Sequence, residues 1–243
     1  MNNLIIIPAR GGSKSIANKN MKIFCGRPLL YWVIKVARES GLGKICVSSD
    51  NEEIRAYALS EGVDAPFLRP ANLAEDLTPT EPVLIHALDF YSKAGLNFEN
   101  TTLLQPTSPF RRVEDLEQAY LKLTSKSSIT CVLSVREAIA NENPHWMIIQ
   151  NQEGGVTKFN GDSLLKMNAR RQDLPKVYIR NDYVYCFKSK NLYDGVPNLY
   201  GNSPELLIAE ADRVDVDINT HRDWLIAEAA FEKVFLDHGK VNG

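Results

Sequence analysis

The sequence predicts an α/β fold in which a doubly wound, mostly parallel sheet carries helices on both faces. Two observations lead to this fold class. Short apolar runs, each bounded by turn residues, alternate through the first half of the chain with segments whose apolar residues recur at helical spacing. The rhythm stops after Val135 and resumes near Asp182, which indicates that an insertion interrupts the sheet.

The first elements follow from simple patterns. The run Leu4–Ile7 is apolar throughout and stops at a proline, as expected of a buried strand. A helix is expected over residues 28–39, which begin with a proline and carry apolar residues at helical spacing. A strand is expected over residues 44–49, after which Asp50 is expected to cap a helix that begins near Glu52.

The remaining elements continue the alternation around the insertion. Residues 136–180 are polar and basic, and their glycine pairs are typical of hairpin turns. We therefore expect a main domain formed by residues 1–135 and 181–243, with an insertion at 136–180. Helices are expected over residues 80–94, 113–123 and 220–236, strands over 101–104, 129–135, 182–187 and 213–218, and a short extended piece at 63–68.

Composition limits the possible functions and locations. The chain has 243 residues and a net charge of −2, so general electrostatic binding to nucleic acid is not expected. Its four cysteines form no Cys-x-x-Cys pair, which favours reduced core residues over metal ligands. We expect a cytoplasmic protein, because no secretory signal is visible and no apolar run approaches the length that crosses a bilayer.

The loop after the first strand is the strongest candidate for a binding site. Gly11 and Gly12 allow the backbone to approach a ligand closely, and Arg10, Lys14 and Lys19 surround them with positive charge. Exposed N–H groups and cations together suit a phosphate. Neither a P-loop nor a dinucleotide-binding glycine pattern is present. The alternative is a basic surface turn between a strand and a helix.

Polar groups also follow later strands, and ligands of open α/β sheets bind at such strand ends. Gln105 stands in a turn that two prolines stiffen, and it offers both a donor and an acceptor to a ligand. The turn serves equally well as the start of the next helix. Between Arg69 and the helix near residue 80, Asp76, Thr80 and Glu81 suit either a sugar or a helix cap.

Asp215 and Asp217 are two residues apart on an expected strand, so their carboxylates share a face. Mg²⁺ is the natural partner of such a pair, since it is bound by one or two carboxylates together with substrate phosphates. The alternative is that Asp217 caps the last helix while Asp215 forms a salt bridge. Together with the basic loop, a metal at this pair would suit transfer of a nucleotidyl group.

At these positions the chain resembles the CMP-sialic acid synthetases, also called acylneuraminate cytidylyltransferases. The resemblance extends along nearly the whole chain, and the order and spacing of the motifs make it specific. The motifs are Ala9-Arg10-Gly11-Gly12-Ser13-Lys14 with Lys19-Asn20, Val47-Ser48-Ser49-Asp50, Phe67-Leu68-Arg69-Pro70 with Leu73, Ala74 and Asp76, Leu103-Leu104-Gln105-Pro106-Thr107-Ser108-Pro109 with Arg111, Arg171-Gln172 with Leu174-Pro175 and Arg180-Asn181, and Val214-Asp215-Val216-Asp217 with Asp223.

The resemblance implies a Rossmann-like nucleotidyltransferase that works with Mg²⁺. It would convert CTP and an acidic nine-carbon 2-keto-3-deoxy sugar, such as sialic acid or a bacterial relative, into the CMP-sugar and pyrophosphate. The anomeric hydroxyl of the sugar would attack the α-phosphate. The family is typically homodimeric, with the insertion reaching around the neighbouring subunit, and it needs neither nucleic acid nor a membrane.

The resemblance also implies roles for individual residues. Lys19, Arg10 and Asp217 would be catalytic: Lys19 would counter charge on the leaving group, and Asp217 would orient or deprotonate the attacking hydroxyl. Asp215 and Asp217 would bind Mg²⁺. The nucleotide would be bound by Ala9, Arg10, Gly11, Gly12, Ser13, Lys14, Lys19, Asn20, Arg69 and Thr80, and the sugar by Gln105, Arg171, Arg180 and Asn181.

Three positions depart from the family pattern. Ser15 stands where the family usually has glycine, Ala17 where it often has proline, and Asp182 where glycine commonly follows the Arg-Asn pair. An added carboxylate at Asp182 would disfavour an acidic sugar or select an amino-substituted one. Two alternative functions stay open: a CMP-Kdo-type synthetase for an eight-carbon or amino sugar acid, and a non-catalytic nucleotide-binding relative.

Overall fold

The computed structural model describes residues 2–168 and 170–239. The chain forms two compact units. The first consists of Met1–Ser134, Asn181–Leu207 and Val214–Gly243, and the second of Val135–Arg180 and Ile208–Arg213. The second unit therefore contains a short return segment, residues 208–213, that lies outside the expected insertion.

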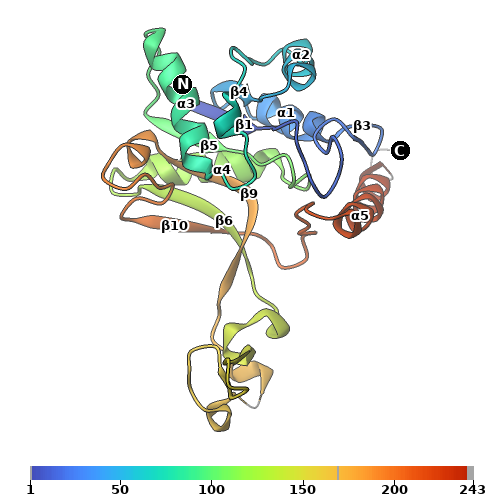
Figure 1. Ribbon diagram of the computed structural model, residues 1–243, viewed down its shortest axis with the longest axis vertical. Helices are drawn as coiled ribbons and strands as arrows, with labels where there is room; N and C mark the ends of the chain where they lie inside the picture. Colours follow the sequence, from blue (N-terminus) through green and yellow to red (C-terminus); the bar gives the residue numbers. More distant parts are fainter. Residues whose placement is uncertain (1, 169, 240–243) are drawn as a thin grey trace. The chain divides into compact units, whose positions relative to one another are not determined.

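A six-stranded sheet organises the first unit (Figure 1). The strand order is β10-β6-β9-β5-β1-β4, in which β1 pairs in parallel with both β4 and β5, whereas β5 pairs antiparallel with β9. The predicted mostly parallel α/β sheet is thus confirmed, with a mixed character that β9 introduces. The strands are β1 (Asn3–Pro8), β4 (Lys44–Ser48), β5 (Asn100–Leu103), β6 (Cys131–Glu137), β9 (Tyr178–Lys188) and β10 (Pro204–Ile208).

Helices bury both faces of this sheet. Ile5 and Ile7 of β1 pack in one core cluster with apolar residues of α1, α2 and α4. Leu4 and Ile6 point to the opposite face and are equally buried, and α3 packs against β1 and β4. The helices are α1 (Leu29–Ser40), α2 (Glu52–Ser60), α3 (Thr80–Lys93), α4 (Val113–Ser125) and α5 (His221–Gly239), with short 3₁₀ turns η1 (Ala71–Leu73) and η6 (Ser189–Leu192).

A smaller core cluster fixes α5 and the loop that follows β1. Ile16 of that loop packs with Phe24 and Leu29, and Trp224 and Phe231 of α5 close the cluster. Phe24 belongs to a two-stranded ribbon, β2 (Ile23–Phe24) and β3 (Arg27–Pro28), that precedes α1. In the described part of the chain, no helix has the length and apolar character needed to span a membrane.

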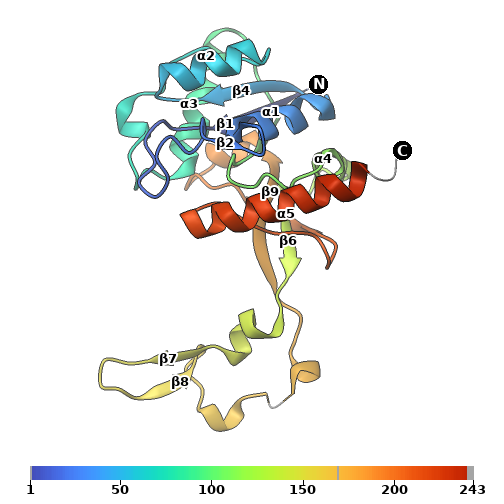
Figure 2. The same ribbon diagram turned by 90° about the vertical axis from the view of Figure 1, so that its right-hand side faces the viewer.

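The second unit is built from short elements. Strands β7 (Ile148–Gln150) and β8 (Val156–Lys158) form an antiparallel hairpin around the predicted glycine turn, as Figure 2 shows. The hairpin-like character expected of this region is therefore confirmed. Its described residues also form the 3₁₀ turns η2 (Ala140–Glu142), η3 (Pro144–Trp146), η4 (Leu164–Lys166) and η5 (Arg171–Asp173).

Two local predictions were wrong. The last strand is β10, and residues 213–218 form no strand. Their backbone groups bond elsewhere: the hydroxyl of Tyr183 donates to the carbonyl of Val214, and the N–H of Ile218 donates to the carbonyl of Thr107. The cap of α2 is Asn51, whose Oδ1 accepts the N–H groups of residues 53 and 54. The carboxylate of Asp50 does not cap α2 and instead accepts a hydrogen bond from the loop after β1.

Candidate active site

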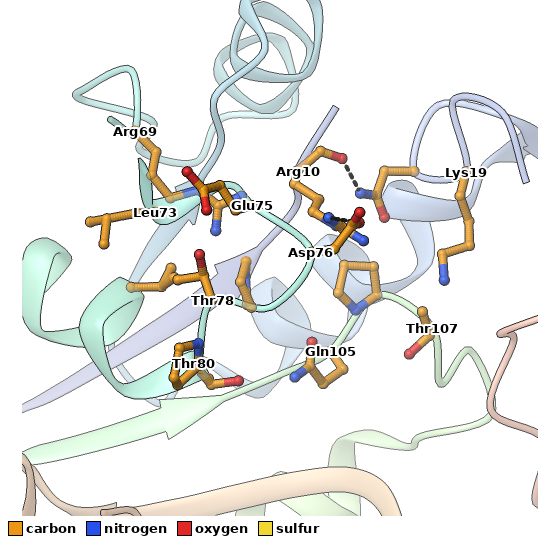
Figure 3. A pocket seen from close by; sticks show the side chains of 15 residues that line it. Arg10, Lys19, Arg69, Leu73, Glu75, Asp76, Thr78, Thr80, Gln105 and Thr107 are labelled. Atoms are coloured by element: carbon orange, nitrogen blue, oxygen red, sulfur yellow. Dashed lines mark hydrogen bonds and ion pairs between the residues drawn. The ribbon is translucent and has the colours of Figure 1, made fainter. Parts of the chain in front are cut away.

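An open pocket of about 750 Å³, counting space open to solvent, lies in the first unit at the carboxyl ends of β1 and β5 (Figure 3). Because β4 and β5 flank β1 on opposite sides, this is the switch point at which open α/β sheets bind ligands. Six of the predicted site residues line the pocket: Arg10, Lys19, Asn20, Arg69, Thr80 and Gln105.

The loop after β1 is held in place from several directions. The N–H of Gly11 donates to Oδ1 of Asp50 over 2.9 Å, and the buried Asn20 donates from Nδ2 to the carbonyl of Arg10 over 2.9 Å. A Cβ on Gly11 would stand 2.7 Å from Cβ of Asn51, so the loop needs glycine here. Asn20 therefore positions the loop in addition to lining the pocket.

The loop's two departures from the family pattern face solvent. Ser15 and Ala17 are both exposed, whereas Ile16 between them is buried in the core cluster beneath α5. Gly12 and Lys14 are exposed as well, Ser13 is half-buried, and Ala9 is fully buried and donates its N–H to the carbonyl of Ser48. The anchoring of the loop thus depends on Ile16 rather than on residues 15 and 17.

Lys19 connects the loop to the segment before α5. Its Nζ donates to the carbonyl of Ile218 over 2.9 Å. Burial lowers the pKa of Lys19; the nearby carboxylate of Asp217 opposes this shift, and the cation of Arg10 adds to it. An anion bound beside this partly buried ammonium group would stabilise its charged form.

Arg69 is a buried guanidinium on the pocket wall, with an exposed fraction of 5%. Its Nε and Nη2 make no hydrogen bond with the described residues, and Oδ1 of Asp50 lies 3.7 Å from Nη2. Burial lowers the pKa of Arg69, and the charge of Asp50 opposes that shift. Buried donors without acceptors are costly, so this side chain is suited to a ligand that brings acceptors.

Arg111 fixes the polar turn after β5. Its Nη2 donates to the carbonyl of Gln105 over 2.6 Å, and its Nε donates to the carbonyl of Tyr183 over 2.8 Å. Full burial lowers the pKa of Arg111 to about 10, which leaves it charged at neutral pH. Sequence reasoning recognised Arg111 only as part of a motif, because its partner Tyr183 lies far away along the chain.

The two aspartates before α5 have different surroundings. One carboxylate oxygen of Asp217, Oδ1, is buried without a hydrogen-bond partner, and the other accepts from the amide of Asn219. Asp217 does not cap α5, because Thr220 and Asp223 cap it reciprocally. Asp215 is half-buried. Within the described residues no three metal-ligating side chains cluster, but Mg²⁺ with substrate phosphates needs only one or two carboxylates.

The predicted sugar-binding residues fall in different places. Gln105 lines the pocket, while Arg171 and Arg180 belong to the second unit. Asn181 is buried in the first unit, and its Nδ2 has no hydrogen-bond partner among the described residues. Asp182 adopts a positive φ of 55°, so this position keeps the left-handed backbone that glycine favours, and Tyr185 donates its hydroxyl to the Asp182 carboxylate.

Several pocket residues were not predicted. Asp50 supports the site from the end of β4, and Thr107 lies in the turn after β5. The segment between η1 and α3 contributes Glu75, Asp76 and Thr78, of which the sequence had singled out only Asp76. Asp76 is no helix cap, since the residue before α3 is Pro79.

A cationic pocket at the switch point of a mostly parallel sheet defines the class of α/β proteins that bind phosphorylated ligands. The chain belongs to the cytidylyltransferase family, whose sequence profile matches residues 4–202. The family resemblance and the nucleotidyltransferase class expected from the sequence are thus confirmed.

Two relatives resemble the chain over most of its length. The chain is 29% identical over 232 residues to CMP-N,N'-diacetyllegionaminic acid synthase of Legionella pneumophila, covering 94% of this chain and 96% of that protein. It is 39% identical over 179 residues to pseudaminic acid cytidylyltransferase of Campylobacter jejuni, covering 73% and 75%. A solved CMP-2-keto-3-deoxy-manno-octonic acid synthetase complexed with CTP shares the fold, with a TM-score of 0.68, 15% identity and coverage of 96% and 99%.

The burial of Lys19 predicts a pH-dependent stability difference. Because its pKa is lowered in the folded protein, folding penalises the charged form at neutral pH, and the penalty disappears as pH rises toward the ordinary value of 10.5. Wild type should therefore gain stability relative to Lys19→Met as pH rises. Urea unfolding of both proteins across this range measures the difference, and a flat or falling difference would contradict the assignment.

Proposed function

We propose that this protein is a CMP-nonulosonate synthetase. It transfers CMP from CTP to a nine-carbon 2-keto-3-deoxy sugar acid and releases pyrophosphate. The observation that carries the nucleotide half of this proposal is the pocket at the switch point, with the buried donors of Arg69 and the cations Arg10 and Lys19. The names of the two relatives, which specify legionaminic and pseudaminic acid, support the sugar half.

Arg69 suits the base of CTP. Cytosine presents two acceptors side by side, N3 and O2, whereas uracil presents a donor at N3. The two unpartnered N–H groups of Arg69, Nε and Nη2, match a pair of acceptors. Asn20 supports this region by holding the backbone of Arg10. Selection of cytosine over uracil would follow, because uracil would leave one guanidinium donor buried and unpaired.

The cations of the loop suit the triphosphate. Arg10 and Lys19 line the pocket. Residues 12–14 of the same loop, with the cation of Lys14, are exposed or half-buried. In transfer of a nucleotidyl group, the sugar hydroxyl oxygen forms a bond to the α-phosphorus as the bond to the bridging oxygen breaks. Pyrophosphate leaves with that electron pair, and Lys19 is placed to offset its growing charge.

Asp217 suits the metal ion and the attacking hydroxyl. Its buried oxygen, which has no hydrogen-bond partner among the described residues, suits a cation or the proton of an attacking hydroxyl. We assign Asp215 and Asp217 to Mg²⁺, which would neutralise phosphate charge when bound. Asp217 would orient the sugar hydroxyl and accept its proton. The backbone of Ile218 is bonded on both sides, to Lys19 and Thr107, which holds Asp217 in place.

We assign the sugar acid to Gln105 and Asn181 of the first unit. As the family resemblance implies, Arg171 and Arg180 would pair with the sugar carboxylate in the site of a neighbouring subunit. The backbone of Gln105 is rigid, since Arg111 binds its carbonyl. Asn181 offers an unpartnered amide donor. The carboxylate of Asp182 is already bonded to Tyr185, which favours a structural role over selection of an amino sugar.

We further propose that the protein is a homodimer formed through the second unit. This unit buries few apolar side chains and exposes several large ones, which is typical of an interaction surface. The four free cysteines fit the reducing cytoplasm, where we place the enzyme. The exposed apolar residues of the unit include Ile139 (58%), Ile148 (57%), Phe159 (59%) and Leu165 (96%).

The substrate assignment predicts the outcome of a sugar panel. With CTP and Mg²⁺, the protein should release pyrophosphate with at least one nine-carbon acid among sialic, legionaminic and pseudaminic acids, and more slowly with the eight-carbon Kdo. UTP in place of CTP should lower the rate at least about tenfold, because one donor of Arg69 would lose its acceptor. Release with none of these sugars would refute the enzymatic proposal, and a preference for Kdo would favour the alternative.

The metal assignment predicts the behaviour of Asp217→Asn. This variant keeps the size of the side chain but removes its charge, so turnover should fall at least about 100-fold while the unfolding midpoint stays close to that of wild type. Asp223→Asn provides the control, because Asp223 caps α5 instead. Turnover of Asp217→Asn near that of wild type, or equal loss in both variants, would contradict the assignment.

The dimer assignment predicts the effect of Leu165→Asp. A charge at this exposed apolar position should weaken self-association at least about tenfold, because a dimer would have to bury it. Leu121→Asp is the matched control, since Leu121 is 70% exposed on α4 of the first unit. Sedimentation equilibrium measures both variants. A monomeric wild type, or a Leu165→Asp dimer as stable as wild type, would overturn the proposal.

A further inference from the structure

An acidic residue of the chain itself pairs with two cations of the loop after β1. Oδ1 of Asp76 lies 2.6 Å from Nη1 of Arg10, and Oδ2 of Asp76 lies 2.5 Å from Nζ of Lys14. Figure 3 shows Asp76 beside Arg10 at the pocket. One carboxylate thus bridges Arg10, which the proposed function assigns to the triphosphate, and Lys14, which the family resemblance assigns to the nucleotide.

The segment that carries Asp76 has its own turn structure. The N–H of Thr78 donates to the carbonyl of Glu75, and the hydroxyl of Thr78 donates to the carbonyl of Asn72. These bonds are internal to residues 71–78, so the turn can persist when the ion pairs of Asp76 break. At its tip, Leu77 is 94% exposed.

Charge and exposure indicate how strongly Asp76 is held. The hydrogen bonds from Lys14 and Arg10 lower the pKa of Asp76, so it is ionised at neutral pH. Exposed ion pairs are individually weak, because water and salt screen them. Pyrophosphate carries several negative charges and more acceptor oxygens than one carboxylate, so it competes effectively for the same two cations.

We propose that Asp76 is a displaceable internal anion that sets the affinity of this enzyme for polyphosphate. Without nucleotide it keeps Arg10 and Lys14 together at the pocket. The outer phosphates of CTP displace it, and after the reaction it competes with pyrophosphate for the two cations and speeds product release. The inference rests on the proposed function, and it makes Asp76 an affinity-determining residue of that reaction.

Direct binding of inorganic pyrophosphate, measured by calorimetry with Mg²⁺ and without sugar, tests the proposal. Asp76→Asn should bind pyrophosphate about three- to tenfold more tightly than wild type, since no internal anion competes. Asp76→Glu restores the charge and should bind within about twofold of wild type. CMP should bind equally to wild type and to Asp76→Asn, because it lacks the outer phosphates.

Glu75→Gln provides the matched control, because Glu75 is the neighbouring acid of the same segment and lines the same pocket. It should change pyrophosphate affinity by less than about twofold. Equal tightening in Glu75→Gln would show a general charge effect and would overturn the proposal. So would unchanged or weaker binding by Asp76→Asn, or tightening by Asp76→Glu.

These experiments distinguish failure of the proposed function from failure of the role of Asp76. If wild type releases no pyrophosphate from CTP with any sugar acid, the enzymatic assignment fails, yet the calorimetric comparison still reports whether Asp76 competes with the anion. If wild type is active, pyrophosphate should inhibit Asp76→Asn at about three- to tenfold lower concentration than wild type. Equal inhibition would contradict a role for Asp76 in product release.

Discussion

The structure depends on buried positive charge at the carboxyl edge of the sheet. Burial lowers the pKa values of Lys19, Arg69 and Arg111, which means that each is held as a cation at a cost. The chain's own acids offset part of this cost, with Asp50 near Arg69 and Asp217 near Lys19. Donors of Arg69 nevertheless stay unpaired. A polyanionic nucleotide would supply acceptors and negative charge to these cations, and the free energy released would contribute to its binding.

The scaffold serves to hold these charges in place. The loop after β1 is fixed at one end by the bond from Gly11 to Asp50 and at the other by Ile16 in the core beneath α5. Arg111 fixes the turn at Gln105, and the backbone of Ile218 joins that turn to Lys19. Three segments distant in sequence are thereby held at one pocket, and preorganised groups of this kind lose little entropy when a ligand binds.

Local patterns in the sequence predicted most of the fold, because apolar periodicity reflects burial directly. They failed at residues 213–218, which alternate like a strand although Tyr183 and Thr107 bind their backbone. Strand-end motifs also located the pocket, including Arg69 and Lys19. The roles of Asp50, Arg111 and Asp76 could not be predicted, because each depends on partners that only the folded chain brings close.

The central claim is that this pocket is built for a cytidine nucleotide with several phosphates. Calorimetric titration of wild type with CTP, CDP, CMP and cytidine in the presence of Mg²⁺ tests it most directly. Each added phosphate should strengthen binding, and CTP should bind at least about 100-fold more tightly than cytidine, since charge-assisted bonds to the cations are the strong ones. Equal affinity for CTP and cytidine would contradict the account.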